Sequence, residues 1–328
     1  MKILLVAKPW KGGLAKYLFQ ALSDAFPNQV RWLPTYPDSF SEHLRYRQNK
    51  SAWLDQLVTT INQTDYDVAI FVNYLSIFKK LRADRRHLLW MTDAPNIKQG
   101  EDTAFERIFI SDLGYEQRLL TQIDAHRYQG ELAFACYPKL HQPAQLKQIK
   151  TRDACFIGNK DPFRDHHLGY LLQQKIDVQV YGNYFLRTPL FWQYPLHVHA
   201  GVQNKAMQQI YAQHKLSINI HAKVVKDGTN MRTFECAAYQ IPQVIDTRPG
   251  LSRFFEENAL MVSEQPAQML SHIHYLLDYP AYAEEMAVYA RQIVLSQHTY
   301  YHRLLQALHG WLPADAEYRL QQASTLSY

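Results

Sequence analysis

The stretch LSINIHAKVVKDGTNMRTFECAAYQIPQVID, residues 216–246, decides the fold class of this chain. The apolar run 216–220 predicts a buried strand, 231–239 predicts a helix, and 243–246 predicts the next strand. A strand, a helix and a second strand in this order favour a parallel sheet covered by helices. We therefore expect an α/β protein.

The same alternation extends in both directions along the chain. Further strands are predicted at 2–7, 29–33, 67–73, 87–92, 107–110, 131–135, 154–158, 178–182 and 260–262. The stretch 137–150 contains two prolines and little apolar periodicity, which predicts an interdomain linker. We expect two doubly wound Rossmann-like domains, 1–145 and 146–310, that face each other across a ligand-binding cleft, followed by a polar, loosely held tail over 311–328.

The composition of the 328 residues is that of a folded protein. Apolar residues make up 47% and charged residues 20%, which excludes a disordered chain. Lys and Arg number 35 against 30 Asp and Glu, a surplus too small to favour nucleic acid as a partner. The longest apolar run, 68–78, is too short to span a membrane, and the N-terminus lacks the apolar stretch of a secretory signal, so we expect a cytoplasmic protein.

The cysteines and histidines do not form a metal-binding pattern. Cys136, Cys155 and Cys236 are far apart in the sequence, which disfavours both a disulfide framework and a zinc site. The histidine pairs at 197/199 and 272/274 lack nearby carboxylates that would complete a ligand set. We expect no metal and no cofactor.

The residues that open the predicted helix are the first candidates for a binding site. Gly228, Thr229 and Asn230 are residue types that begin helices, and a helix N-terminus can hold a phosphate. Arg232 lies in the first turn, where a cation is unfavourable for the helix dipole, so an anionic ligand nearby would explain it. The alternative is that Arg232 and Glu235, at i and i+3, form an ordinary surface ion pair.

Two glycines follow the first predicted strand. Gly12 and Gly13 would let backbone N–H groups approach a phosphate or a sugar at the start of the next helix. The alternative is that they are present for steric reasons alone. The sequence GxGxxG is absent, so a dinucleotide-binding fingerprint is not supported.

The run 227–235 and the segment 241–251 resemble the C-terminal signature of the CgeB-like glycosyltransferases, enzymes of the GT-B type. These enzymes are related to a large retaining group in which two acidic residues flank seven others, as Asp227 and Glu235 do here. This chain departs from the family at Tyr239 and Gln240, where a small residue is usual. The likeness continues at 153–160, 180–182, 216–221 and 298–303, and more loosely at 90–95, 110–115 and 134–138.

The resemblance implies a role for each matching residue. Glu235 would hold the ribose of a nucleotide, Asp227 would contact the transferred sugar, and Arg232 would add positive charge. Lys160 or Arg164 would neutralise the leaving diphosphate. The other implied donor-binding residues, which would meet the diphosphate or the base, are Gly228, Thr229, Asn230, Tyr181 and Gly182. In the first half, Asp93 follows a strand and is our candidate for a base at the reaction centre, with a turn cap as the alternative.

The function that the resemblance implies is transfer of a hexose from a nucleotide sugar, with a UDP-sugar expected, to a glycan, lipid-linked or protein acceptor of the cell envelope. Retention of configuration and a metal-independent reaction are expected with it, and the nucleotide sugar is a co-substrate. The alternatives are a nucleotide-sugar epimerase and a nucleotide-sugar-binding protein without turnover. Two basic groups, 45–50 and 79–86, could contact the inner membrane face, or could be ordinary solvated faces.

Overall fold

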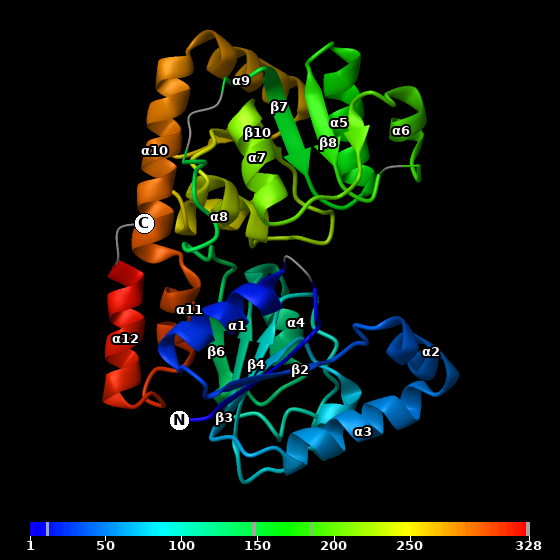
Figure 1. Cartoon of the computed structure of the whole chain (residues 1–328), viewed down its shortest axis with the longest axis vertical. Helices are drawn as coiled ribbons and strands as arrows, with labels where there is room; N and C mark the ends of the chain where they lie inside the picture. Colours follow the sequence, from blue (N-terminus) through cyan, green and yellow to red (C-terminus); the bar gives the residue numbers. More distant parts are fainter. Residues whose placement is uncertain (11–12, 146–148, 185, 326–328) are drawn as a thin grey trace. The chain divides into compact units, whose positions relative to one another are not determined.

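The computed structural model describes residues 1–10, 13–145, 149–184 and 186–325. The chain forms two compact units: Met1–Ala133 together with Tyr300–Ser324, and Phe134–Thr299 together with Thr325. In Figure 1 the first unit contains the blue and cyan part of the chain and its red end. The division differs from the expected domains because the chain returns to its first unit after residue 299.

The first unit is built on a sheet of six parallel strands. Across the sheet they are β2 (Val30–Pro34), β1 (Ile3–Ala7), β3 (Val68–Val72), β4 (Arg86–Met91), β5 (Arg107–Ile110) and β6 (Tyr128–Glu131). The α-helices of this unit are α1 (Leu14–Ala25), α2 (Phe40–Gln48), α3 (Lys50–Gln63), α4 (Glu116–Leu120), α11 (Tyr300–Ala307) and α12 (Ala314–Thr325). Short 3-10 segments lie at Ser76–Lys80, Leu113–Tyr115 and Ala125–Arg127.

Helix α12 corrects the expectation of a loose tail. Its Leu320 and Ala316 are fully buried, and Arg319 donates to the carbonyl oxygen of Ala25 at the end of α1 at 2.6 Å. Helix α11 packs against α1 as well, and Arg303 donates to the carbonyl oxygen of Ala133 at 2.9 Å. The last helices therefore complete the core of the first unit.

The second unit has its own six-stranded parallel sheet. Across the sheet the strands are β12 (Met261–Ser263), β11 (Gln243–Asp246), β10 (His214–Asn219), β7 (Arg152–Ile157), β8 (Val178–Tyr181) and β9 (Val198–His199). Its helices are α5 (Pro162–Gln173), α6 (Pro189–Gln193), α7 (Lys205–Gln213), α8 (Met231–Ala238), the 3-10 helix η4 (Pro249–Arg253), α9 (Pro266–Asp278) and α10 (Pro280–Gln297).

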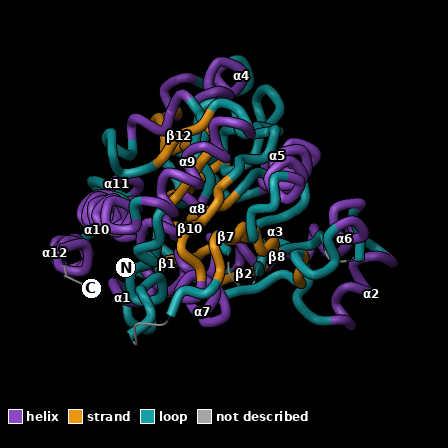
Figure 2. The backbone as a smooth tube through the Cα atoms, turned by 90° about the horizontal axis from the view of Figure 1, so that it is seen from above, coloured by secondary structure: helices purple, strands orange, loops and turns teal. Residues whose placement is uncertain are grey.

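The strands of this second sheet are buried on both faces, as the continuous apolar runs predict. Ala154 and Phe156 of β7 pack with α5 and α9, whereas Cys155 and Ile157 pack with α7 and α8. Figure 2 shows α5 and α9 on one side of β7 and β10, and α7 on the other. The α/β class and the doubly wound arrangement expected from the sequence are confirmed.

Both sheets contain a point at which the strand order reverses. In the first unit it lies between β1 and β3, and in the second between β7 and β10. Helices leave neighbouring strands in opposite directions at such a point, so a crevice opens outside the carboxyl ends of those strands, and ligands usually bind there. In the second unit, the loop 220–230 follows β10 and lies at the reversal of the strand order.

Candidate functional site

Arg164 of α5 lies across the reversal point of the second sheet. Its Nε donates to the carbonyl oxygen of Ile220, after β10, at 2.7 Å, and its Nη1 donates to that of Asn159, after β7, at 2.8 Å. The guanidinium therefore joins the two loops that border the crevice. This is one of the two cations expected to neutralise a diphosphate, whereas the other, Lys160, has an exposed side chain and is held through its backbone N–H to Asn183 at 2.5 Å.

Helix α8 begins where the sequence predicts. The side chain of Asn230 accepts a hydrogen bond from the backbone N–H of Thr233 at 3.1 Å, which makes Asn230 the N-cap. Such a cap satisfies one of the N–H groups that a helix leaves without an internal acceptor. In the described part of the chain, the backbone N–H groups of Thr229 and Asn230 have no acceptor. This helix start therefore offers donors to an anionic ligand.

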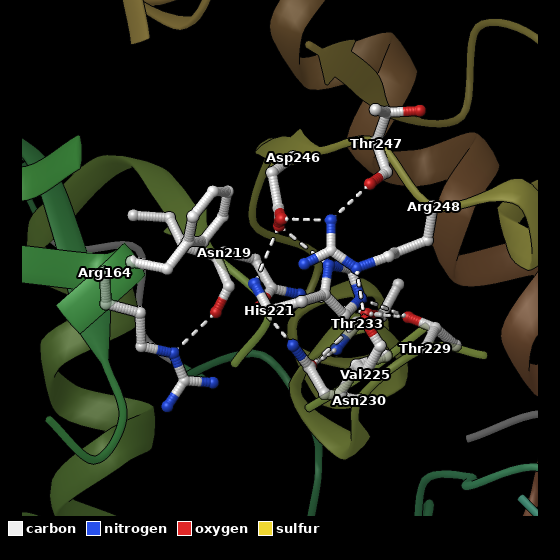
Figure 3. A network of polar contacts seen from close by, with 12 residues as sticks. Arg164, Asn219, His221, Val225, Thr229, Asn230, Thr233, Asp246, Thr247 and Arg248 are labelled. Atoms are coloured by element: carbon white, nitrogen blue, oxygen red, sulfur yellow. Dashed lines mark hydrogen bonds and ion pairs between the residues drawn. The ribbon is translucent and has the colours of Figure 1, made fainter. Parts of the chain in front are cut away.

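Behind the helix start lies a buried network of side chains, drawn in Figure 3. The Thr229 and Thr233 hydroxyls lie 2.6 Å apart, and Asn219 donates to the Thr233 hydroxyl at 3.0 Å. Thr229 also lies 3.0 Å from Nε2 of His221, whose Nδ1 lies 2.7 Å from Asp246. The hydroxyl of Thr229 is consequently engaged inside the protein, and its backbone N–H is the group left for a ligand.

The charges in this network are compensated. Burial lowers the pKa of His221, and the hydrogen bond to Asp246 acts in the opposite direction. Burial alone would raise the pKa of Asp246, but the hydrogen bond from His221 and the charge of Arg248 lower it overall. Arg248 lies 2.7 Å from the second carboxylate oxygen of Asp246. The lowered pKa of His221 favours a neutral imidazole, and the lowered pKa of Asp246 favours a carboxylate, which pairs with the guanidinium of Arg248.

Asp227, expected to contact the transferred sugar, is held by the segment after β11. Its carboxylate pairs with Arg253 of η4, at 3.0 Å from Nη2 and 3.3 Å from Nη1, and its carbonyl oxygen accepts from the Gly250 N–H at 2.8 Å. The Asp227 side chain remains 22% exposed. A bidentate ion pair fixes the plane of a carboxylate and leaves lone pairs on its oxygens for further hydrogen bonds.

Glu235, expected to hold the ribose, is fully buried and forms an ion pair with Arg232. The i,i+3 pair of the alternative interpretation is therefore present, but it is not a surface pair. His141, from the predicted linker, is also fully buried, with Nε2 3.8 Å from Oε1 of Glu235. Burial raises the pKa of Glu235 to about 7, and the charge of Arg232 acts in the opposite direction. The exposed group of this cluster is Arg232, with a side chain 20% exposed.

Tyr181 and Gly182, expected near the base, are placed at the end of β8. The Tyr181 ring is half-buried and stacks on His199 with centroids 4.7 Å apart. A Cβ at Gly182 would overlap the carbonyl oxygen of Gly158, so this glycine is required by the close approach of two loops.

The candidate residues of the first unit are Asp93 and the two early glycines. Asn73 donates from Nδ2 to the Asp93 carboxylate at 2.9 Å, and its Oδ1 accepts from the Asp93 backbone at 3.2 Å. Asp93 is exposed as a residue, yet desolvation of its carboxyl raises its pKa, and Lys8 acts in the opposite direction. Gly13 is the N-cap of α1, and Gly12 lies outside the described residues.

Several residues of the site were not singled out in the sequence. They are Asn219, His221 and Asp246 of the network, Arg253, and His141. Polar residues at the end of an apolar run, such as Asn219 and His221, are a signal that a search of strand ends could use. In the described part of the chain no group of three or more His, Cys, Asp and Glu side chains could hold a metal ion.

The part of the chain that contains α8 is similar to a known protein family. Residues 166–309 match a family model described as glycosyl transferase-like. This part of the chain is therefore similar to glycosyl transferase-like domains. It contains the reversal-point loop, α8 and the segment that holds Asp227. A search of curated proteins finds no match.

Solved glycosyltransferase structures share the fold of both units. HepE from Anabaena, in complex with UDP and glucose, has 13% identity and a TM-score of 0.70, over 93% of this chain and 98% of that chain. Sucrose-phosphate synthase from Thermosynechococcus elongatus has 12% identity and a TM-score of 0.68, over 93% and 97%. The β-glucosyltransferase of T4 phage, in complex with UDP-glucose, has 16% identity and a TM-score of 0.60, over 99% and 100%. The expected GT-B fold is confirmed.

Proposed function

We propose that the chain is a glycosyltransferase that uses a UDP-sugar as donor. The observation that carries the proposal is the start of α8, where unsatisfied backbone N–H groups and Arg164 border the crevice of a glycosyl transferase-like domain. A diphosphate leaving group needs such donors and cations. The structures of HepE with UDP and glucose, and of the T4 enzyme with UDP-glucose, support the choice of nucleotide.

The proposed reaction breaks the bond between the anomeric carbon and the UDP oxygen and forms one to an acceptor hydroxyl. The acceptor proton goes to a base, for which Asp93 is the candidate, and the diphosphate charge is met by Arg164 and the Thr229 N–H. Asp227 would accept hydrogen bonds from the sugar. The proposed ribose contact of Glu235 would replace part of its pairing with Arg232, because the carboxylate has no exposed surface.

We also propose the finer features that the sequence implies: a CgeB-like enzyme, hexose transfer with retention, no metal, and a glycan or lipid-linked acceptor at the inner membrane face. The two basic groups support the membrane contact unequally. Lys79, Lys80 and Arg82 are in ion pairs, which favours a solvated face. Arg45 and Arg47 lie on α2, a helix without a buried residue. No helix in the described ranges is long and apolar enough to cross a membrane.

The proposal is tested by offering the protein UDP-glucose, UDP-galactose, UDP-N-acetylglucosamine and GDP-mannose, and measuring thermal stabilisation and nucleotide release. We expect stabilisation by UDP and by one UDP-sugar, with UDP release that depends on an added glycan. Glu235→Ala should abolish the stabilisation, and Asp227→Ala should reduce transfer more than binding. Stabilisation without release would indicate a binding protein, and no response to any nucleotide would contradict the proposal.

A further inference from the structure

We propose that His221 is a positioning residue of the donor site: it holds the Thr229 hydroxyl, and thereby fixes the backbone N–H groups that meet the diphosphate. This proposal rests on the proposed function and deepens it. It makes the affinity for the donor depend on His221, a residue that does not touch the donor. His221 and Thr229 are 0% and 3% exposed. Neither side chain is available to a ligand in the crevice.

The hydrogen bonds around His221 have one direction. A carboxylate can only accept, so the Nδ1–H of His221 donates to Asp246, at 2.7 Å. The neutral ring then has a lone pair on Nε2, which accepts from the Thr229 hydroxyl at 3.0 Å. Because Asn219 donates to Thr233, the Thr233 hydroxyl can donate in turn, either to Thr229, at 2.6 Å, or to Oδ1 of Asn230, at 3.4 Å. The hydrogen bonds from Asp246 through His221 to Thr229 therefore connect the end of β11 with the start of α8.

The backbone of the same loop is held from the same segment. Arg248 donates to the carbonyl oxygen of Val225 at 3.0 Å, and the Gly250 N–H donates to that of Asp227 at 2.8 Å. These two hydrogen bonds hold the part of the loop that precedes Gly228 in the sequence. The contact of His221 with Thr229 acts on the other side of Gly228, next to the N–H groups of Thr229 and Asn230. Losing it would release the part of the loop that the diphosphate meets.

Two substitutions at His221 separate its two contacts. The amide of Asn in His221→Asn can still donate to Asp246, but it is too short to reach Thr229. The longer side chain in His221→Gln can place its carbonyl oxygen near the position of Nε2 and accept from Thr229. A matched control is His214→Gln: His214 lies at the other end of β10, is 1% exposed, and bonds to the carbonyl oxygen of Ile210.

The experiment measures KM for UDP-glucose, kcat and the melting temperature of the full chain and these variants. We expect His221→Asn to raise KM roughly ten-fold, the effect of one lost buried hydrogen bond, with a smaller change in kcat. His221→Gln should keep KM within roughly three-fold of wild type, because it restores that bond. His214→Gln should lower the melting temperature and leave KM unchanged.

The outcomes are distinguishable. An unchanged KM in His221→Asn, or KM changes that follow only the melting temperature across all three variants, would overturn the positioning role and leave the proposed function standing. If His221→Asn does not fold, the KM values of His221→Gln and His214→Gln decide, and equal increases in the two would overturn the role. A wild-type protein that neither binds UDP-glucose nor transfers from it would remove the proposed function, and this inference with it.

Discussion

Gly250 shows how one absent side chain shapes the surroundings of Asp227 in the proposed donor site. Its N–H donates to the carbonyl oxygen of Asp227, and a Cβ at this position would overlap both that oxygen and the guanidinium of Arg253. Arg253 is the partner of the Asp227 carboxylate. The lack of a side chain at Gly250 therefore allows Asp227 to be held through its backbone and its carboxylate at once.

We expect Gly250→Ala to push Asp227 away from Arg253. The overlap should lower the free energy of unfolding by about 1–3 kcal/mol, the usual cost of overpacking, and should reduce transfer from the UDP-sugar. Gly169→Ala in α5 is the control, because its Cβ would lie 3.9 Å from Leu190, an ordinary contact. Chemical denaturation and initial rates measure both effects. Equal behaviour of the two variants would contradict the steric account.

The buried Glu235 makes a pH-dependent contribution to stability. Burial raises its pKa from about 4.5 to about 7 in the folded chain, so the folded state binds its proton more tightly than the unfolded state. The stability that this supplies is complete below pH 4.5 and is lost as pH rises through 7. His141, whose pKa burial lowers to about 3, contributes with the opposite sign.

Glu235→Gln removes this titration and keeps the shape of the side chain. We expect the difference in free energy of unfolding, wild type minus variant, to fall by roughly 3 kcal/mol at most between pH 4.5 and 8. Since His141 is present in both proteins, its own titration largely cancels. Urea unfolding at several pH values measures the difference. Parallel curves for the two proteins would show that Glu235 does not titrate in this range.

Local residues of the site could be predicted from the sequence, and distant partners could not. Asn230 opens α8 because its side chain can cap a helix start nearby in the sequence. Arg253 and Asp227 are 26 residues apart, and His221 and Asp246 are 25 apart, so only the fold brings them together. Burial of Glu235 by His141 was equally hidden, because 137–150 has the composition of a linker.

At the scale of elements, the strands with long apolar runs were the predictable ones. β5 and β11 lie at the predicted 107–110 and 243–246, whereas β9 has two residues and carries too little periodicity to be recognised. The predicted strand 131–135 is wrong in position: β6 is Tyr128–Glu131, and its pairing with β5 has a register shift. Such irregularities depend on neighbouring strands, not on local sequence.

Helix α2 is the element that best fits a membrane contact. It begins with a capping box at Ser39 and Glu42, so it is well formed although no residue in it is buried. Phe40 and Leu44, one turn apart, are 80% and 45% exposed. With Arg45 on the same helix, these side chains could enter the interface of an anionic bilayer.

We expect the protein to be retained on vesicles that contain phosphatidylglycerol, and to be released as salt rises. Replacing Phe40 and Leu44 together by Ser should weaken the retention at least roughly ten-fold, through loss of apolar burial. The control replaces Lys79 and Lys80 by Gln, because both lysines are already in ion pairs. Sedimentation measures retention. Equal retention of all three proteins would exclude α2 as the contact.

At the scale of the whole molecule, the chain leaves its first compact unit after residue 133 and returns to it after residue 299. The composition of 311–328 gave no sign of this, because α12 is a polar helix with few apolar positions. Its buried apolar residues, Ala316 and Leu320, are fully enclosed in the first unit. Integrity of the first unit therefore requires α12 as well as the strands near the start of the sequence, whereas the loop 220–230 belongs to the second unit.

This division predicts that stability and donor binding can be altered separately. Leu320→Ala should lower the free energy of unfolding by roughly 2–5 kcal/mol, because it leaves a cavity in the first unit. Tyr318→Ala, in the same helix but at a side chain 61% exposed, should cost far less. The stabilisation by UDP should persist in both variants, since no residue of α12 belongs to the loop 220–230 of the proposed donor site. Thermal unfolding with and without UDP measures both quantities, and loss of the UDP effect in folded Leu320→Ala would show that the two units do not act separately.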